Sequence, residues 1–427
     1  MENVFKNRNF ALTFFGGLVS NVGAALYSFA VGFFILEITG NNAVTQNNYL
    51  ALCTAGMLIA TLPGGVISDK YNRAKVMYIC DYLKGALVLI TTFLIIRFAG
   101  SSQLQVTVLF VFGFIGNIVS GIFYPASDAL MPMIVKEEQL QQATSYTQAR
   151  NGFQSIAGVL LAGILYSLLP ATTLFIIVGL CYVASGVSEM FIRYDFVPKE
   201  DPLTLKYAVG DIKEGFRYAV SFKPLLALMT FSLLANFFAT PIGSVPPYFV
   251  RTEVASAQSY LFDSFLTPEL WSSVITTAMG VGMILMALVL SARPQKEHNG
   301  PDVKKGIVEM AAICVAFAAA YHILYIRLGR LDLLLIGMVL GFFGAGLVSG
   351  KVNVLCGASM MKVVDKDKLG KVMGITAIAS QAMAPIASVI AGQLIYRHGI
   401  IAPLIFVAAG LSFMAIFGVR SKALDEL

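Results

Sequence analysis

The sequence predicts an all-α membrane protein with twelve transmembrane helices, arranged in two six-helix halves that are pseudo-repeats of each other. Three observations support this prediction: an apolar composition, twelve long apolar runs, and a repeated pattern in the two halves. Of the 427 residues, 57% are hydrophobic and 13% are charged, whereas a soluble domain is about 45–50% apolar and about 25% charged. A soluble protein of this length would need more polar surface, so the composition excludes one.

The apolar residues gather in twelve runs, each long enough to cross a membrane as a helix, which takes about 20 residues. Stretches such as ALVLITTFLII (86–96) do not alternate between polar and apolar residues, as the strands of a membrane β-barrel would. We therefore expect helical spans. In chain order they are residues 10–36, 47–68, 75–98, 103–125, 141–168, 172–192, 223–251, 268–291, 305–328, 331–350, 369–395 and 401–419.

The placement of basic residues predicts the orientation, because cytoplasmic loops carry more Lys and Arg than outer loops. With the N-terminus in the cytoplasm, the inner segments hold 23 of the 30 basic residues and the outer loops hold 5. Lys84 and Arg150 fall inside predicted spans. We expect a multi-pass protein of the cell membrane with both termini in the cytoplasm. Its net charge of +6 suits an inner face that meets anionic lipid and requires no nucleic-acid partner.

The longest inner connection, residues 193–222, separates a predicted N-terminal half (1–192) from a C-terminal half (223–427). Apolar residues recur at helical spacing in this linker, and charged residues occupy the other side. The pattern predicts a helix lying in the cytoplasmic interface of the membrane. A solvated linker with chance periodicity is the alternative. The apolar positions are Leu205, Val209, Ile212, Phe216 and Ala219.

The two halves repeat. A shift of 229 positions places VSG (119–121) on VSG (348–350) and Met131 on Met360, and the register continues without a gap into the next span. Parallel six-span repeats are typical of transporters, whose substrate sites lie between the halves near the middle of the membrane. The repeat therefore favours a carrier over a channel.

The stretch GGVISDKYNRAK (64–75) is a short charged loop between the second and third spans. The two glycines are expected to let the end of span two approach a neighbouring helix. Asp69 can accept hydrogen bonds from a helix N-terminus, and Arg73 can bind a carboxylate through two N–H groups, with Asp128 as the expected partner. The residues of this predicted cytoplasmic latch are Gly65, Asp69, Lys70, Arg73 and Asp128.

The loop resembles the loop signature of the major facilitator superfamily, a glycine followed by an aspartate, a basic residue and a second basic residue. Three more stretches resemble the macrolide-efflux-like branch of its drug exporters: CDYLKGALVL (80–89), YPASDALMPMIVKEEQLQQA (124–143) and DIKEGFRYAVSFKPLLALM (211–229). The resemblance covers nearly the whole chain. It implies a secondary carrier that exports bulky amphiphiles, commonly driven by proton entry.

Polar residues inside the spans are candidates for a substrate cavity. Arg150 lies about nine residues into span five, about 13 Å along a helix, and a charge at such depth typically faces protein or a wet cavity. It could contact an anionic part of a substrate or a titrating carboxylate; alternatively it reaches the interface or braces a helix. A membrane Asn or Gln is also a common hydrogen-bonding link between helices. The candidates are Asn21, Arg150, Gln154, Asn236 and Gln381.

Proton coupling needs an acid or base that titrates within the membrane. Spans one and four hold no carboxylate near their middle. Asp81 and Lys84 are three residues apart and are expected to form a structural ion pair on one helix face. Asp81 is also one of the titratable residues inside the spans. The ion-coupling candidates are Asp81, Glu189 and His322.

Enzyme and metal motifs are missing from the sequence. Its five cysteines form no CxxC pair, and its three histidines are scattered, so we expect neither a disulfide framework nor a metal site. Gly350-Lys351 lacks the other residues of a nucleotide-binding loop. We expect no cofactor and no enzymatic activity, and a monomer whose partners are a small amphiphile and the lipid bilayer.

Together these features predict a secondary active transporter that exports an amphiphilic small molecule, such as a drug or macrolide, as an antiporter coupled to proton entry. One alternative is an exporter or flippase of an anionic or lipid-like substrate, such as a siderophore or lysophospholipid, which Arg150 and the missing central acid favour. An alternative of another class is a membrane sensor or scaffold that transports nothing. Such a protein should carry a signalling domain, for which the segments outside the spans are too short.

Overall fold

The structure is a computed structural model that describes residues 4–196, 210, 217, 221–291, 299–364, 375, 376 and 378–421. The described residues form helices and no strands. Within this described part of the chain, twelve helical stretches are long and apolar enough to cross a membrane, and each overlaps one predicted span. The protein is therefore a multi-pass all-α membrane protein, as predicted. The interfacial helix predicted within 193–222 lies outside the described residues.

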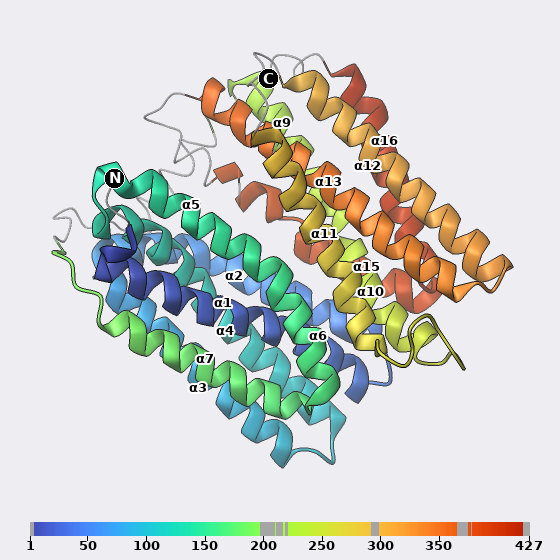
Figure 1. The fold of residues 1–427 in the computed structure, drawn as a ribbon, viewed down its shortest axis with the longest axis horizontal. Helices are drawn as coiled ribbons and strands as arrows, with labels where there is room; N and C mark the ends of the chain where they lie inside the picture. The colour runs from blue at the N-terminus through green and yellow to red at the C-terminus, as the bar shows by residue number, and fades with distance from the viewer. Residues whose placement is uncertain are drawn as a thin grey trace. The chain divides into compact units, whose positions relative to one another are not determined.

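The first six spans comprise α1 to α7, in which the fifth span is divided by a short π-helical segment, η2 (Figure 1). Asn7 caps α1, since its side chain accepts hydrogen bonds from the backbone N–H groups of Asn9 and Phe10. The elements are η1 (Val4–Lys6), α1 (Arg8–Ile38), α2 (Ala43–Lys70), α3 (Arg73–Arg97), α4 (Ser102–Ile134), α5 (Glu137–Phe153), η2 (Gln154–Gly158), α6 (Val159–Leu168) and α7 (Ala171–Met190).

The last six spans are less regular, because three of them are interrupted in the described residues. The seventh contains a 3-10 and a π-helical segment, the ninth contains a π-helical segment, and a turn at residues 382 and 383 interrupts the eleventh. The seventh span contains Pro241, Pro246 and Pro247. Each of these prolines lacks the backbone N–H group that would donate a hydrogen bond within a regular helix. The elements are α9 (Lys223–Ala239), η3 (Thr240–Ser244), α10 (Val245–Phe249), η4 (Val250–Val254), α11 (Pro268–Ser291), α12 (Gly300–Ala320), η5 (Tyr321–Arg327), α13 (Leu331–Val363), α15 (Ala384–His398) and α16 (Ile401–Arg420).

Two spans continue farther than the sequence predicts. The fourth was expected to end at residue 125 and the tenth at residue 350, but α4 continues to Ile134 and α13 to Val363. Pro125 and Pro132 lie inside α4 without ending it. Helices within a bundle tolerate such prolines, because neighbouring groups can satisfy the carbonyls that lose a hydrogen bond.

The chain divides into two compact units. Unit 1 comprises Met1–Gly40 and Leu52–Ala208, and unit 2 comprises Asn41–Ala51 and Val209–Leu427. Unit 2 therefore includes the first turns of α2, where the Ser244 hydroxyl donates a hydrogen bond of 2.6 Å to the side-chain oxygen of Asn47.

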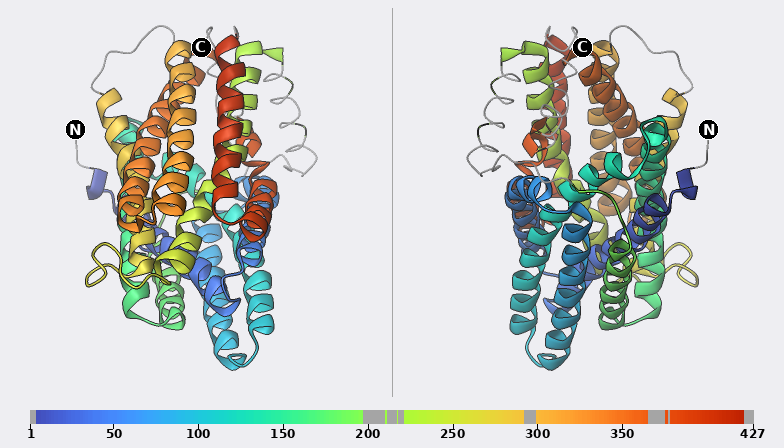
Figure 2. Two further views of the ribbon diagram at one scale, coloured as in Figure 1. Left: turned by 90° about the vertical axis from the view of Figure 1, so that its right-hand side faces the viewer. Right: turned by 90° about the vertical axis from the view of Figure 1, so that its left-hand side faces the viewer.

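In unit 1, α3 packs against α4 and α7, and α1 packs against α7. Figure 2 shows α3 and α4 as an antiparallel pair joined by a short turn. Small residues permit the close approach: a Cβ atom at Gly85 would lie 3.1 Å from the Gly179 carbonyl oxygen, and one at Gly23 would lie 3.0 Å from Cys181 Cβ. Packing between small residues is a main source of helix association in membranes.

The repeated VSG tripeptide has the same packing role in both units. In unit 1, a Cβ at Gly121 of α4 would lie 2.5 Å from the carbonyl oxygen of Met57 in α2. In unit 2, a Cβ at Gly350 of α13 would lie 2.6 Å from the carbonyl oxygen of Met283 in α11. Each glycine marks the point where two helices cross backbone to backbone. The repeat seen in the sequence is therefore a repeat of helix crossings.

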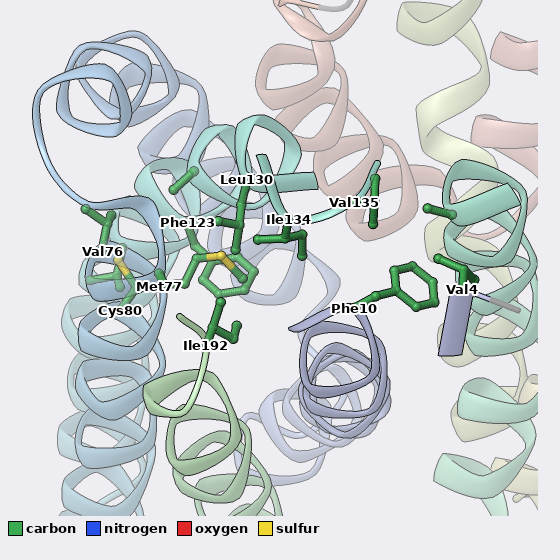
Figure 3. Close-up of a cluster of buried hydrophobic side chains, with 14 residues drawn as sticks. Val4, Phe10, Val76, Met77, Cys80, Phe123, Leu130, Ile134, Val135 and Ile192 are labelled. Carbon is green, nitrogen blue, oxygen red and sulfur yellow. The ribbon is translucent and has the colours of Figure 1, made fainter. Parts of the chain in front are cut away.

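A buried apolar cluster lies near the ends of α1, α3, α4 and α7 in unit 1 (Figure 3). Met77 and Cys80 of α3, Phe123 and Leu130 of α4, and Ile192 belong to it. Met77 and Phe123 also line a polar cavity. The apolar core thus fixes the helices that form one wall of the candidate site.

Candidate functional site

A polar cavity of about 400 Å³ lies within unit 1. Its wall combines an arginine, two carboxylates and several amide and hydroxyl side chains, with few apolar ones. Three of the five predicted cavity residues, Asn21, Arg150 and Gln154, line it. The polar lining residues are Thr13, Asn21, Tyr124, Ser127, Asp128, Thr144, Thr147, Gln148, Arg150, Asn151, Gln154 and Glu189.

Arg150 extends from α5 toward α1. Its Nη1 donates a hydrogen bond of 3.3 Å to the Thr13 carbonyl oxygen. A Cβ atom at Gly17 would overlap this guanidinium group, so the missing side chain at Gly17 makes room for it. The Nε atom of Arg150 is buried and has no hydrogen-bond partner among the described residues. The guanidinium therefore retains an unused donor at the cavity wall.

The sequence did not single out Gly17 or Thr13. Gly16-Gly17 is a glycine pair inside a span, which signals close approach of some group. The pair does not say which group, because α5 is more than a hundred residues away in the chain.

A second cavity, of about 280 Å³, lies within unit 2 and is mostly apolar. Asn236, a predicted cavity residue, lines it, and its side-chain amide donates 2.9 Å to the Ser232 carbonyl oxygen of its own helix. Flexible methionines and aromatic rings can adapt to apolar groups of different shapes. The sulfur-containing and aromatic lining residues are Phe231, Met279, Met283, Met310, Cys314, Phe317, Phe342 and Met414.

Gln381 lines neither of these two cavities and is exposed. His322, a predicted ion-coupling residue, is likewise exposed on the π-helical segment η5 and lines neither cavity. The structure therefore separates both residues from the sites that the other candidates form.

The predicted ion pair between Asp81 and Lys84 is present in α3, with 2.7 Å between Lys84 Nζ and Asp81 Oδ1. Both residues are buried, and Asp81 has no exposed surface. The Lys84 ammonium also lies 4.1 Å from the ring centre of Phe123 and 4.6 Å from that of Tyr182. Two aromatic rings and one carboxylate thus surround this buried cation, which is favourable for an ammonium group removed from water.

Glu189, the third ion-coupling candidate, lies on α7 at the wall of the polar cavity. It has no exposed surface, and neither carboxyl oxygen has a hydrogen-bond partner among the described residues. Lys84, Asp81 and Arg150 are near enough to interact with it electrostatically. The structure thus brings a predicted coupling residue and a predicted substrate residue to one site.

Most of the stretch predicted as a charged loop is helical, because α2 continues to Lys70 and α3 begins at Arg73. An ion pair joins the two helix ends across the short turn, with 3.2 Å between Arg73 Nη2 and Asp69 Oδ1. The backbone N–H of Arg73 donates 2.8 Å to the Tyr194 hydroxyl. Lys70 lies at the end of α2, with its ammonium 5.8 Å from the ring centre of Tyr71. These contacts fix the turn between the two helices.

Two details of the predicted latch differ in the structure. Arg73 pairs with Asp69 and not, among the described residues, with Asp128, which lies on the cavity wall in electrostatic contact with Arg150. Gly64, and not Gly65, provides the close helix approach: a Cβ at Gly64 would lie 2.5 Å from the Gly121 carbonyl oxygen, while one at Gly65 meets nothing within 4 Å. Successive helix positions differ by about 100°, so only one of two neighbouring glycines can face α4.

None of the five cysteines, which were not expected to form a disulfide framework, is joined in a disulfide. The described residues contain no cluster of histidine, cysteine and acidic side chains that could hold a metal ion.

Known proteins resemble this chain over most of its length. The family described as Major Facilitator Superfamily matches residues 13–388. Macrolide efflux protein A of Streptococcus pyogenes is 26% identical over 254 residues, which are 57% of this chain and 60% of that protein. The multidrug efflux pump Tap of Mycolicibacterium fortuitum is 22% identical over 422 residues, 97% of this chain and 96% of that protein.

The fold also resembles that of solved transporters. A crystal structure of a bacterial homologue of the iron transporter ferroportin superposes with a TM-score of 0.70 at 15% identity, covering 97% of this chain and 98% of the other. At this identity the similarity concerns the fold alone.

Proposed function

This chain belongs to the major facilitator superfamily of transporters, and on that premise we propose that it exports an amphiphilic small molecule in exchange for protons. The relatives named as efflux proteins support export. The observation that carries the proposal is the chemical contrast between the two cavities. The cavity of unit 1 offers hydrogen bonds and charges, and the cavity of unit 2 offers methionine and aromatic side chains.

An amphiphile has both a polar and an apolar part, so a protein that offers both kinds of lining suits it. Transport follows from alternating access, in which the two six-helix halves rock around a central site. We place the protein in the cell membrane with both termini in the cytoplasm, because the basic residues lie mainly in the segments on that side. It works without a cofactor and as a monomer.

A second candidate function is the export or flipping of an anionic or lipid-like substrate. The free Nε donor of Arg150 at the cavity wall favours it, since a guanidinium binds carboxylates and phosphates through paired hydrogen bonds.

The test is the accumulation of a macrolide, erythromycin, and of a cationic dye, ethidium, in bacteria that lack their own efflux pumps. Cells expressing the protein should accumulate less of either compound than cells with an empty vector. A protonophore should abolish the difference. Because dye uptake depends on membrane voltage, the vector control receives the same protonophore. If well-expressed protein changes neither accumulation, drug export is wrong, and anionic and lipid substrates become the next probes.

The loop between α2 and α3 gives a further prediction. Asp69→Asn weakens the ion pair with Arg73 and should reduce transport, while the protein still reaches the membrane in normal amounts. The expected loss of stability is at most about 1 kcal/mol, because Asp69 is partly exposed. Asp332→Asn, at an exposed site in the first turn of α13, is the matched control. Full transport activity in Asp69→Asn would show that this loop is not a latch.

A further inference from the structure

Glu189 is the least satisfied ionisable group at the polar cavity. Its side chain has no exposed surface although it belongs to the cavity wall, and both carboxyl oxygens are without a hydrogen-bond partner among the described residues. Burying an ionised carboxylate without a donor or a cation is costly. A carboxyl group in this position must therefore either bind a proton or obtain a positive partner.

The charged and titratable groups around Glu189 come from three helices. The helix α3 provides Asp81, Lys84 and Cys80, and α5 provides Arg150. Tyr182 lies on α7 itself, close to Asp81. The helices α1 and α6, which also pack against α7, carry no charged residue between Asn9 and Leu36 or between Val159 and Leu168.

Of the two cations near Glu189, Lys84 is already paired with a carboxylate, whereas Arg150 forms no ion pair among the described residues. Lys84 is 2.7 Å from Asp81 and is covered by the rings of Phe123 and Tyr182. Arg150 has an unpartnered Nε and otherwise donates to a backbone carbonyl, an uncharged acceptor. Arg150 is therefore the cation that can compensate an ionised Glu189.

This arrangement links the protonation of Glu189 to the charge of the cavity. When Glu189 is ionised, Arg150 and Glu189 neutralise each other. When Glu189 binds a proton, it no longer neutralises the positive charge of Arg150 at the cavity wall. Asp128 is then the remaining carboxylate of the cavity wall that interacts electrostatically with Arg150. One proton thus adds one positive charge to the substrate site.

We propose that Glu189 binds the coupling proton and that Arg150 transmits its protonation to the substrate site by being released from, or drawn to, Glu189. This inference rests on the proposed function, and it names the substrate class. A cationic amphiphile binds best to the ionised site, so it exchanges with the proton and is exported by an inward proton gradient. An anionic amphiphile binds best to the protonated site and would move in the same direction as the proton.

The first test needs no substrate. Infrared difference spectroscopy of the purified full-length protein in lipid, over a pH titration, should show the C=O band of a buried protonated carboxyl group. Glu189→Gln should remove this band. Glu37→Gln is the matched control, because Glu37 is exposed and accepts a hydrogen bond from the Tyr166 hydroxyl, which an amide oxygen can also accept. A titrating buried band that persists unchanged in Glu189→Gln would overturn the proposal.

The second test separates coupling from transport. Proteoliposomes containing Glu189→Gln should still exchange labelled for unlabelled ethidium without a gradient, but should lose ethidium transport driven by a pH gradient to the level of empty liposomes. Wild-type protein and Glu37→Gln should do both. Gradient-driven transport at the wild-type rate in Glu189→Gln would overturn the assignment. If the wild type moves no ethidium, the proposed function is wrong for this probe, and the infrared titration still decides whether Glu189 binds a proton.

Folding of each variant is checked by size-exclusion chromatography. Where Glu189→Gln does not fold, Glu189→Asp replaces it in the infrared test, and the carboxyl band should change in frequency. The corresponding Glu37→Asp variant should leave the band unchanged. An unchanged band in Glu189→Asp counts against the proposal.

Discussion

Replacing Gly346 by leucine is expected to prevent folded protein from accumulating in the membrane, whereas replacing Gly337 by leucine in the same helix is expected to be tolerated. A Cβ atom at Gly346 would overlap the backbone carbonyl of Met279, where α13 crosses α11. At Gly337 a Cβ would meet nothing within 4 Å. The backbone of a helix cannot move aside as a flexible side chain can, so α11 and α13 would have to separate.

The cost of such overpacking is typically about 1–3 kcal/mol and rises when backbone must move. The measurement is the amount of monodisperse protein recovered in detergent, with its thermal unfolding midpoint. Gly346→Ala and Gly337→Ala provide a milder pair, in which only the first should lower the midpoint. Normal yield and stability for both Gly346 variants would mean that α11 and α13 do not cross at this glycine.

Lys84→Met is expected to destabilise the protein by about 3–5 kcal/mol, because it leaves Asp81 without its cation in a fully buried position. Methionine nearly matches the apolar stem of lysine in size, so the loss concerns the charge rather than packing. Adding Asp81→Asn to Lys84→Met should restore much of the stability, because the double variant has no unpaired charge at this site.

The measurement is thermal unfolding of the wild type, both single variants and the double variant. A double-mutant cycle isolates the interaction energy of the pair. If Lys84→Met is as stable as the wild type, then Asp81 does not depend on Lys84, and the buried pair is not the structural contact that its geometry indicates.

The spans were predictable from the sequence because membrane insertion depends on local composition. About 20 apolar residues suffice to identify a span, whichever helices it later contacts. Span ends were less predictable, as α4 shows, because its continuation past Pro125 depends on neighbours that satisfy the backbone. The boundary between the two compact units was also less predictable. Asn41–Ala51 include the predicted start of span two, within the predicted N-terminal half, yet they pack within unit 2.

The candidate site was predictable only as a set of separate residues. Arg150 and Glu189 stood out because charged side chains are rare in apolar spans. Their shared cavity could not be predicted, since it depends on which faces of α5 and α7 meet. The same limit applies to Asp128, which was assigned to Arg73 but lies in the cavity with Arg150.

By itself, the sequence determined the class of protein, its twelve helical spans and the contact between Asp81 and Lys84. These features depend on composition or on residues within one helical turn, whose spacing the helix geometry fixes. Only the tertiary structure decided that Gly17 makes room for Arg150 and that Glu189, Asp128 and Arg150 border one cavity. Such contacts join residues far apart in the chain, and helix packing alone sets which side chains meet.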